Sequence, residues 1–360
     1  MTEEIKGRVS VMIPARNEEA NIERAVRSVA AQRGVREIIV VDDQSSDRTG
    51  AILENLKGEF PSLRTIRIES LPAGWMGKSH ALASAARMAK GDWFLFTDAD
   101  TGHRPESLST LVARAEHEGA DLLSLSPGQR VPTWWEKAVI PLIFAGLARR
   151  FKFEEVSDPR SNVAAANGQY ILIRREIYQQ SGGHEAVRGD VLDDVALARR
   201  VKSLGGHILF LPGAAWAETR MYRTFHEMWQ GWTKNLYALC GGKMTNIVDE
   251  VARTFLLDFL PAAALASFIS LFILELWTPD LSMWISMGAF VSLSAVSGRL
   301  WSYRRELGRL GLDSRAAKYL FLGSPMYAVL LLNSARAHAR GRVTWKGREY
   351  ETRNSTMGEE

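Results

Sequence analysis

Short apolar segments alternate with amphipathic segments through the first half of the chain. The apolar segments, which predict buried strands, occupy residues 9–15, 37–43, 63–70, 92–98 and 121–126. Between them apolar residues recur at helical spacing, as they do at Ile22, Ala25, Val26 and Val29. This alternation predicts an α/β fold, with a parallel sheet and helices on both of its faces. Sites in such sheets lie beyond the carboxyl ends of the strands.

Two later segments extend this pattern. Residues 167–178 predict a strand that passes into a helix. Residues 192–205 predict an amphipathic helix that begins with Asp193 and Asp194. Acidic residues at the start of a helix suit the helix dipole, so capping is one explanation of this pair.

Apolar residues are concentrated after residue 250. Residues 255–277 are long enough to cross a bilayer, and residues 281–301 follow after a short turn, which predicts a membrane-spanning hairpin. The basic residues after this hairpin predict that its open end faces the cytoplasm. A third span at residues 319–335 would place the later basic residues outside, so we expect a re-entrant or interfacial segment broken near Pro325.

A shorter apolar segment, residues 138–151, follows Trp134 and Trp135. It is too short to span a membrane and predicts an interfacial helix. A buried core helix is the alternative.

The charge of the chain narrows the class of partner. The formal net charge is +4 and the pI is about 9.2. Arg and Lys cluster beside apolar segments, and no basic stripe with interleaved aromatic residues is present, so we expect an anionic membrane surface and no nucleic acid. Cys240 is the only cysteine, which excludes an internal disulfide and a cysteine-based metal site. The polar start, MTEEIKGR, predicts no signal peptide.

Carboxylates gather at the ends of two predicted strands. Asp42 and Asp43 end the second strand, and Asp98 and Asp100 end the fourth. Alternate side chains of a strand share a face, so we expect Asp98 and Asp100 side by side, roughly 6 to 7 Å apart. Like charges held together cost free energy unless they share a cation or a proton. The pair therefore predicts a metal site, with a solvated acidic turn as the alternative.

Four motifs identify a resemblance. They are VSVMIPARNEEANIERAVRSVAAQ, IIVVDDQSSDRT, GWMGKSHAL and FTDAD, and they occur in the order and spacing of the family 2 glycosyltransferases. PARNEE stands where a dinucleotide-binding fold would have G-x-G-x-x-G, which disfavours a nicotinamide or flavin enzyme. The chain most resembles membrane-attached bacterial members associated with hopanoid and carotenoid pathways. The likeness covers roughly residues 8–240, and the tail VTWKGREY also looks like theirs.

The resemblance implies a domain plan. We expect a GT-A domain, the Rossmann-like fold of nucleotide-diphospho-sugar transferases, over residues 1–250. Transmembrane or membrane-associated helices would occupy residues 251–335, and a basic cytoplasmic tail residues 336–360. The protein would lie in the bacterial inner (plasma) membrane, as a multi-pass protein with its catalytic domain in the cytoplasm.

The resemblance also implies roles for the carboxylates. Asp43 would accept a hydrogen bond from the donor's base, and the same pocket would be lined by Asp42, Pro14, Ala15 and Glu18. Lys78 would bind the diphosphate, and Asp98 and Asp100 would hold Mg²⁺ or Mn²⁺, which prefer oxygen ligands. His103 would at most assist, since a solvent-facing turn histidine is the simpler interpretation. The alternatives are a helix-capping cluster at residues 42–47 and a surface lysine at residue 78.

Asp194 resembles the family's general base. Asp193 replaces the Glu that family members have before it. Processive relatives carry Q-x-x-R-W after the base, whereas this chain has MWQGWTKN, so a chain-elongating polymerase is disfavoured. Gln230, Trp232 and Lys234 of this segment are assigned to the acceptor or product side, with plain packing as the alternative.

These assignments predict a metal-dependent inverting glycosyltransferase. It would move a sugar from a UDP- or GDP-linked donor to a hydroxyl or phosphate of a membrane lipid at the bilayer. Two rivals are weaker. FLFTDADTG resembles the nucleophile motif of haloacid-dehalogenase-like phosphatases, but that motif usually opens the domain. A non-catalytic membrane scaffold would have no use for Asp98, Asp100 and Asp194 together.

Overall fold

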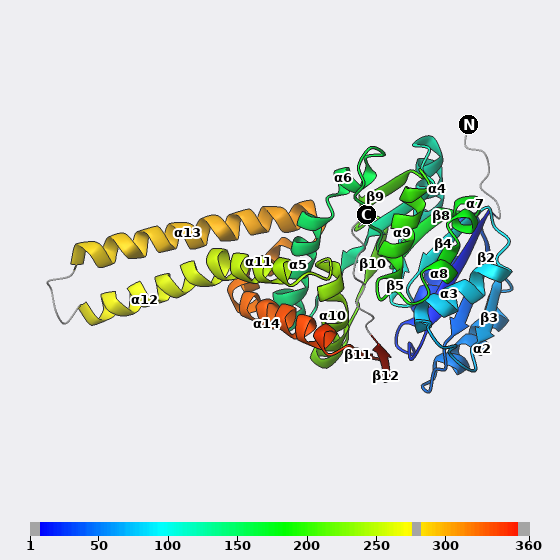
Figure 1. Cartoon of the computed structure of the whole chain (residues 1–360), viewed down its shortest axis with the longest axis horizontal. Helices are drawn as coiled ribbons and strands as arrows, with labels where there is room; N and C mark the ends of the chain where they lie inside the picture. Colours follow the sequence, from blue (N-terminus) through cyan, green and yellow to red (C-terminus); the bar gives the residue numbers. More distant parts are fainter. Residues whose placement is uncertain (1–7, 276–281, 352–360) are drawn as a thin grey trace. The chain divides into compact units, whose positions relative to one another are not determined.

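Residues 8–275 and 282–351 are described by the computed structural model, and the chain divides into two units (Figure 1). Unit 1 contains the residues up to Arg130, Arg150–Met221 and Lys346–Arg348. Unit 2 contains Val131–Arg149, Tyr222–Trp345 and the residues from Glu349. Each unit is described by itself.

The main element of unit 1 is a seven-stranded sheet. Its order is β3 (Leu63–Arg67), β2 (Val35–Asp42), β1 (Val9–Ala15), β4 (Trp93–Thr97), β8 (Tyr170–Arg174), β6 (Leu122–Ser126) and β9 (Ile208–Pro212). The strands predicted from the apolar segments are all present. The prediction of a purely parallel sheet is wrong at β8, which runs antiparallel to β4 and β6. The chain enters β8 at the edge where β4 ends, as the pairing of Thr97 with Tyr170 shows, so β8 must run back.

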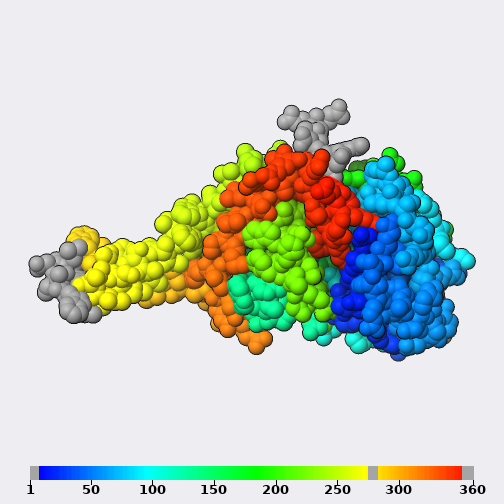
Figure 2. All heavy atoms as spheres, turned by 90° about the horizontal axis from the view of Figure 1, so that it is seen from below, coloured from blue at the N-terminus to red at the C-terminus, as the bar shows by residue number. Residues whose placement is uncertain are grey.

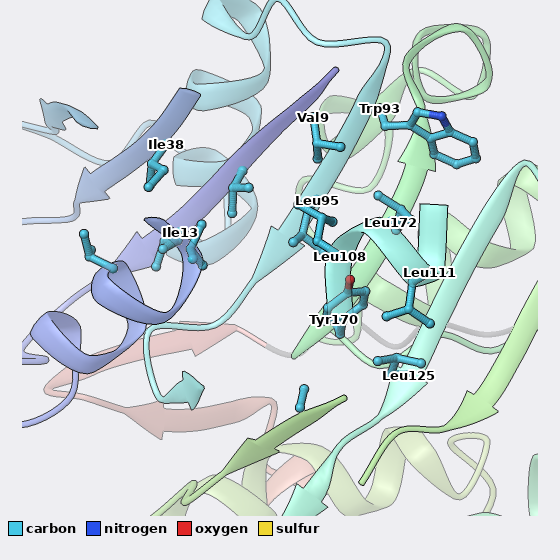
Figure 3. Close-up of a cluster of buried hydrophobic side chains, with 14 of the residues drawn as sticks. Val9, Ile13, Ile38, Trp93, Leu95, Leu108, Leu111, Leu125, Tyr170 and Leu172 are labelled. Carbon is cyan, nitrogen blue, oxygen red and sulfur yellow. The ribbon is translucent and has the colours of Figure 1, made fainter. Parts of the chain in front are cut away.

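Helices cover both faces of this sheet, as the alternating pattern predicted. They are α1 (Ile22–Ala30), α2 (Thr49–Glu59), α3 (Gly77–Met88), α4 (Ser107–His117), α6 (Phe153–Ser157), α7 (Arg175–Gln180), α8 (Gly183–Ala186) and α9 (Asp193–Ser203). One core lies between the sheet and α1, α2 and α4; Figure 3 shows its centre, where Val9, Leu95, Leu172 and Leu111 are fully buried. The other core joins the opposite face to α3, α7 and α9. Burial of these apolar side chains holds the strand ends in fixed positions.

A second, smaller sheet lies directly after β4 in the sequence. It has the order β5 (Thr101–His103), β10 (Ala217–Thr219) and β7 (Gly128–Gln129). β5 begins one residue after Asp100 and pairs antiparallel with β10. The segment after the acidic pair is therefore a buried strand and not a solvated turn.

Unit 2 is helical apart from one hairpin. Its helices are α5 (Trp134–Arg150), α10 (Phe225–Leu239), α11 (Met244–Thr254), α12 (Leu260–Glu275), α13 (Ser282–Arg309) and α14 (Leu320–Ala339). A π-helical turn, Phe255–Phe259, joins α11 to α12, and a 3-10 segment, Ser314–Tyr319, precedes α14. The hairpin strands are β11 (Arg342–Trp345) and β12 (Arg348–Glu351), and the tip between them belongs to unit 1.

The two membrane-related predictions within unit 2 have different outcomes. α14 continues through Pro325, so the predicted break there is wrong; Pro325 stands in the second turn of a helix that follows a 3-10 segment. α5 is largely a buried helix, because Trp135 and residues 138–145 are shielded, whereas Trp134 at its start is half exposed and its last turn is partly exposed. Its Ala138 carbonyl meets Gly323 of α14, and Phe144 packs on Trp232 of α10. The alternative of a core helix is therefore the one that fits.

The predicted hairpin is partly described. α12 and α13 lie side by side (Figures 1 and 2), and residues 276, 277 and 281 of the predicted spans lie outside the described residues. Within the described parts of the chain, one helical stretch, Met244–Leu274, is long and apolar enough to cross a membrane. Asp258, in the π-helical turn of this stretch, is buried and paired with Arg299.

Candidate active site

The carboxyl ends of β1 and β2 place the first group of predicted site residues together. Parallel pairing puts Pro14 opposite Val41 and Ala15 opposite Asp42, and the Asp43 N–H donates to the Ala15 carbonyl at 2.8 Å. The Asp42 carboxylate accepts the Ser45 N–H at 2.9 Å. Asp42 thus holds the loop before α2, and Asp47, which accepts the Thr49 N–H at 3.0 Å, is the residue that the capping alternative describes. Asp43 directs its carboxylate to other partners.

Those partners come from the far end of the sequence. Both oxygens of Asp43 accept hydrogen bonds from the Arg348 guanidinium, at 2.5 and 3.0 Å. Glu18, in the loop after β1, accepts one from the Lys346 ammonium at 2.5 Å. Sequence reasoning missed both basic residues as site residues, because their charge had been explained by the membrane surface.

The acidic pair after β4 adopts a different conformation from the one predicted. β4 ends at Thr97, and the Thr101 N–H donates to the Asp98 carbonyl at 3.1 Å, which closes a turn. The extended-strand spacing expected for Asp98 and Asp100 is therefore wrong, because the chain reverses between β4 and β5. The turn keeps the two carboxylates near each other by another route, and the Arg24 guanidinium holds it by donating to the Asp100 carbonyl.

The negative charge of Asp100 is balanced less well by nearby positive charge than that of Asp98. Burial raises its pKa to about 7, and the negative charges of Asp98 and Glu18 act in the same direction. Thr219 and Lys346 oppose the shift. A carboxylate that resists ionisation in this way is a good site for a cation.

Lys78 and Asp98 form a close ion pair. Lys78 stands in the first turn of α3, and its ammonium lies 2.5 Å from an Asp98 oxygen. Burial opposes the Lys78 charge, but the carboxylates of Asp98, Asp193 and Asp194 together raise the pKa of Lys78 above its usual value. Burial also raises the pKa of Asp98, and the Lys78 charge counteracts it. Lys78 is a half-buried cation paired with Asp98, and the surface-lysine alternative does not describe it.

Asp194 lies near the same lysine. One of its oxygens accepts the Gly168 N–H at 2.8 Å, and the other accepts the Val195 N–H at 2.8 Å. Burial, followed by the charge of Asp193, raises the pKa of Asp194 to about 6. A Cβ at residue 168 would stand 2.7 Å from the Lys78 nitrogen, so the glycine leaves room for the ammonium in its present position. Sequence reasoning did not single out Gly168.

Asp193 is buried beside a histidine. The nearest atoms of Asp193 and His184 are 3.9 Å apart, and burial lowers the pKa of His184 to about 4. His184 is therefore neutral near pH 7. The charge of Asp193 acts instead on Lys78 and Asp194.

His103 takes neither of the positions considered from the sequence. It is a buried residue of β5, hydrogen-bonded to the Thr97 hydroxyl at 3.2 Å, and burial lowers its pKa to about 4. It packs beside Tyr170. The prediction of a solvent-facing histidine is wrong, because β5 enters the second sheet at once.

The predicted acceptor-side residues all lie on α10 of unit 2. Trp232 is buried, with its ring edge-to-face against Phe144 and near Tyr222, which fits the packing alternative. The Lys234 ammonium lies 6.0 Å from the centre of the Trp345 ring, and Gln230 is half-buried. The acceptor-side role of these three residues stays a prediction.

The carboxylates of Asp98 and Asp100 suit a hard cation that keeps other ligands besides the protein. Within residues 8–275 and 282–351, no three His, Cys, Asp or Glu side chains are arranged to hold a metal ion. Asp98 and Asp100 would therefore supply the protein's share alone. Mg²⁺ accepts this arrangement, since it keeps water ligands and binds through one or two carboxylates plus substrate phosphates.

Comparisons with known proteins agree with this geometry. Residues 10–182 match the family model described as glycosyl transferase family 2. The chain is 24% identical over 347 residues to the 4,4'-diaponeurosporenoate glycosyltransferase of Staphylococcus aureus, covering 95% of this chain and 88% of that protein. A solved mannosyltransferase, PcManGT from Pyrobaculum calidifontis in complex with GDP-Man and Mn²⁺, is similar with a TM-score of 0.51 and 20% identity, over 82% of this chain and 88% of the other. That similarity supports the GT-A fold. Through residues 10–182 the chain is therefore similar to the family 2 glycosyltransferases, and it is a glycosyltransferase of the nucleotide-sugar-dependent type.

Proposed function

We propose that this enzyme is a metal-dependent, inverting glycosyltransferase that uses a UDP- or GDP-linked sugar and a membrane lipid acceptor. The observation that carries the proposal is the position of Asp194. One carboxylate with a raised pKa is held by a backbone N–H, close to the Lys78–Asp98 ion pair. An inverting transfer requires one general base of this kind, on the face of the sugar opposite the leaving group.

The chemistry follows from these residues. Asp194 takes the proton from the acceptor hydroxyl, and the oxygen attacks the anomeric carbon from the face opposite the diphosphate. Lys78 stabilises the negative charge that develops on the departing diphosphate. A divalent cation bound by Asp98 and Asp100 would neutralise the same diphosphate. Asp193 raises the basicity of Asp194, and Asp43 would accept a hydrogen bond from the base.

The relatives support this choice of ligands. The Pyrobaculum mannosyltransferase was solved with GDP-Man and Mn²⁺, which is consistent with a nucleotide sugar and a divalent metal here. The name of the S. aureus relative refers to a carotenoid-type acceptor. A phosphatase using Asp98 as nucleophile is not favoured, since the matched family model and the similar proteins are glycosyltransferases.

The membrane part of the proposal is supported by an exposed apolar surface. Large apolar side chains of α12 and α13 face outwards, including Phe272, Leu274, Trp284, Phe290 and Trp301. Exposed apolar surface of this extent is typical of a membrane contact. We place the protein in the inner membrane through α12 and α13, as a multi-pass protein with unit 1 in the cytoplasm, and α10 on the acceptor side.

The test uses full-length protein in detergent with UDP- and GDP-sugars, Mg²⁺ or Mn²⁺, and either a membrane lipid extract or water-soluble acceptors. We expect sugar transfer to lipid only, dependent on the metal, with inversion at the anomeric carbon measured by NMR. Transfer confined to soluble acceptors would contradict the lipid acceptor. Retention of configuration would contradict the single-base mechanism.

A further inference from the structure

The tip of the β11–β12 hairpin has a fixed backbone shape. Its two residues, Lys346 and Gly347, have φ angles of 45° and 75°. Two successive positive φ angles are typical of the tight turn that joins hairpin strands. The tip therefore presents Lys346 and Arg348 from a defined turn, at a cost in backbone strain for Lys346.

Arg348 binds the carboxylate expected at the nucleoside end of the donor pocket. Its guanidinium makes two parallel hydrogen bonds to Asp43 and a third to the Gln44 side-chain oxygen at 2.8 Å. The side chains of Arg348 and Asp43 are only 14% and 6% exposed. A bidentate pair fixes the orientation of a carboxylate, and each oxygen retains a second lone pair for another donor.

Lys346 makes a separate set of contacts on the loop after β1. Its ammonium donates to Glu18 at 2.5 Å and to the Arg16 carbonyl at 2.8 Å, and its own carbonyl accepts from the Arg16 guanidinium. Within the described residues these contacts use two of its three N–H groups, which leaves one. The charges of Glu18 and Lys346 also act on Asp100, so Lys346 lies near the acidic pair as well as on the loop after β1.

We propose that the tip, residues 346–348, is part of the donor site. Arg348 is a positioning residue that orients Asp43 for the base, and Lys346 directs positive charge towards the donor's diphosphate. This inference rests on the proposed function. Its physical reason is charge balance: Glu18, Asp43, Asp98 and Asp100 would repel an anionic donor, and the tip brings two cations to them from outside the motif-bearing segment.

The experiment measures nucleotide binding to full-length protein in detergent by calorimetry, with Mn²⁺ present. The probes are UDP and GDP, the matching monophosphates UMP and GMP, and the nucleosides uridine and guanosine. The variants are Arg348→Ala, Arg348→Lys and Lys346→Met. The control is Arg342→Ala, which removes the same charge from an exposed position of β11.

We expect Arg348→Ala to weaken the binding of the nucleoside diphosphate and of the monophosphate equally, by about tenfold, because Asp43 loses the contact that orients it. Arg348→Lys restores the charge but not the bidentate contact, so it recovers only part of the affinity. Lys346→Met weakens the binding of the nucleoside diphosphate more than that of the monophosphate. Arg342→Ala leaves all affinities unchanged.

Three results would overturn the inference. Unchanged nucleotide affinity in Arg348→Ala and Lys346→Met would mean that the tip only holds the fold together and takes no part in donor binding. Tighter nucleotide binding in either variant would mean that the tip occupies the donor site and that the donor has to displace it. A wild-type protein that binds none of the nucleotides would remove the proposed function together with this inference. If Arg348→Ala does not fold, as a melting curve would reveal, Arg348→Lys and Lys346→Met decide the question.

Discussion

The molecule contains two buried groups of charged side chains, and they are built in opposite ways. In unit 2 three carboxylates are paired with two arginines: Arg299 lies 2.6 Å from Asp258, and Arg149 bridges Glu250 and Glu306 at 2.7 and 3.0 Å. In unit 1, burial and mutual repulsion raise the pKa of both Asp100 and Asp194. The paired group serves the fold. The unit 1 group stores unfavourable charge that a ligand or a proton can relieve, which is typical of catalytic sites.

The largest effect is expected from Asp194→Asn. It removes the base while keeping the size and, through the amide oxygen, one of the two backbone contacts, so kcat should fall by about 10²- to 10⁴-fold with nucleotide affinity retained. Steady-state transfer assays and calorimetry measure the two quantities. Asp190→Asn, an exposed neighbour, is the control. Equal activity of both variants would remove Asp194 from the mechanism.

Breaking the paired group should instead affect folding. Arg299→Met leaves Asp258 buried without its cation, and we expect a loss of about 3–5 kcal/mol in the free energy of unfolding. The double variant with Asp258→Leu should regain most of it. Denaturant titration in detergent, followed by tryptophan fluorescence, provides the measurement. Arg160→Met, in an exposed pair with Asp158, should leave stability unchanged. A stable Arg299→Met protein would show that the pair does not support the fold.

The unit 1 site should make stability depend on pH in a defined direction. The pKa of Asp100 is about 7 in the folded protein and about 4 in an unfolded chain. Between these values the folded state binds more protons, so stability falls as pH rises from about 4 to 7. Melting temperatures in EDTA should fall less steeply for Asp100→Asn than for the wild type, and Mn²⁺ should restore wild-type stability at pH 8. Asp92→Asn, at an exposed carboxylate, should keep the wild-type slope. A wild-type melting temperature that does not vary with pH would contradict the charge excess.

The smallest effect concerns the pH dependence of kcat/KM on its acidic side, the limb where the rate rises with pH. The wild-type kcat/KM should rise with pH around pH 6, as Asp194 loses its proton. Because the charge of Asp193 raises this pKa, Asp193→Asn should move the limb to lower pH. Rates measured across pH 4.5 to 8 in both proteins test this shift. A limb at the same pH would mean that Asp193 has another role.

Hydrophobic patterning predicted most of unit 1 because its strands are buried on both faces and its helices on one. It carried no information on strand direction, which is why β8 was expected to be parallel. The turn at Asp98–Asp100 was missed for a related reason, since a reversal directly after a buried strand leaves little trace in the apolar pattern. Lys346 and Arg348 were misread because a basic residue near apolar helices has the same appearance whether it faces lipid or a carboxylate. Only long-range contacts separate these cases.

The hydrogen bond from Lys346 to Arg16 also has a consequence for how the chain is made. It spans 330 positions of the sequence. Chains emerge N-terminus first, so β1 and β2 can pair long before the hairpin tip exists. The tip is synthesised only after Met244–Leu274, the stretch suited to cross a membrane. Asp43 and Glu18 therefore receive their cations after that stretch has been made, and completion of the pocket becomes a late event in biosynthesis.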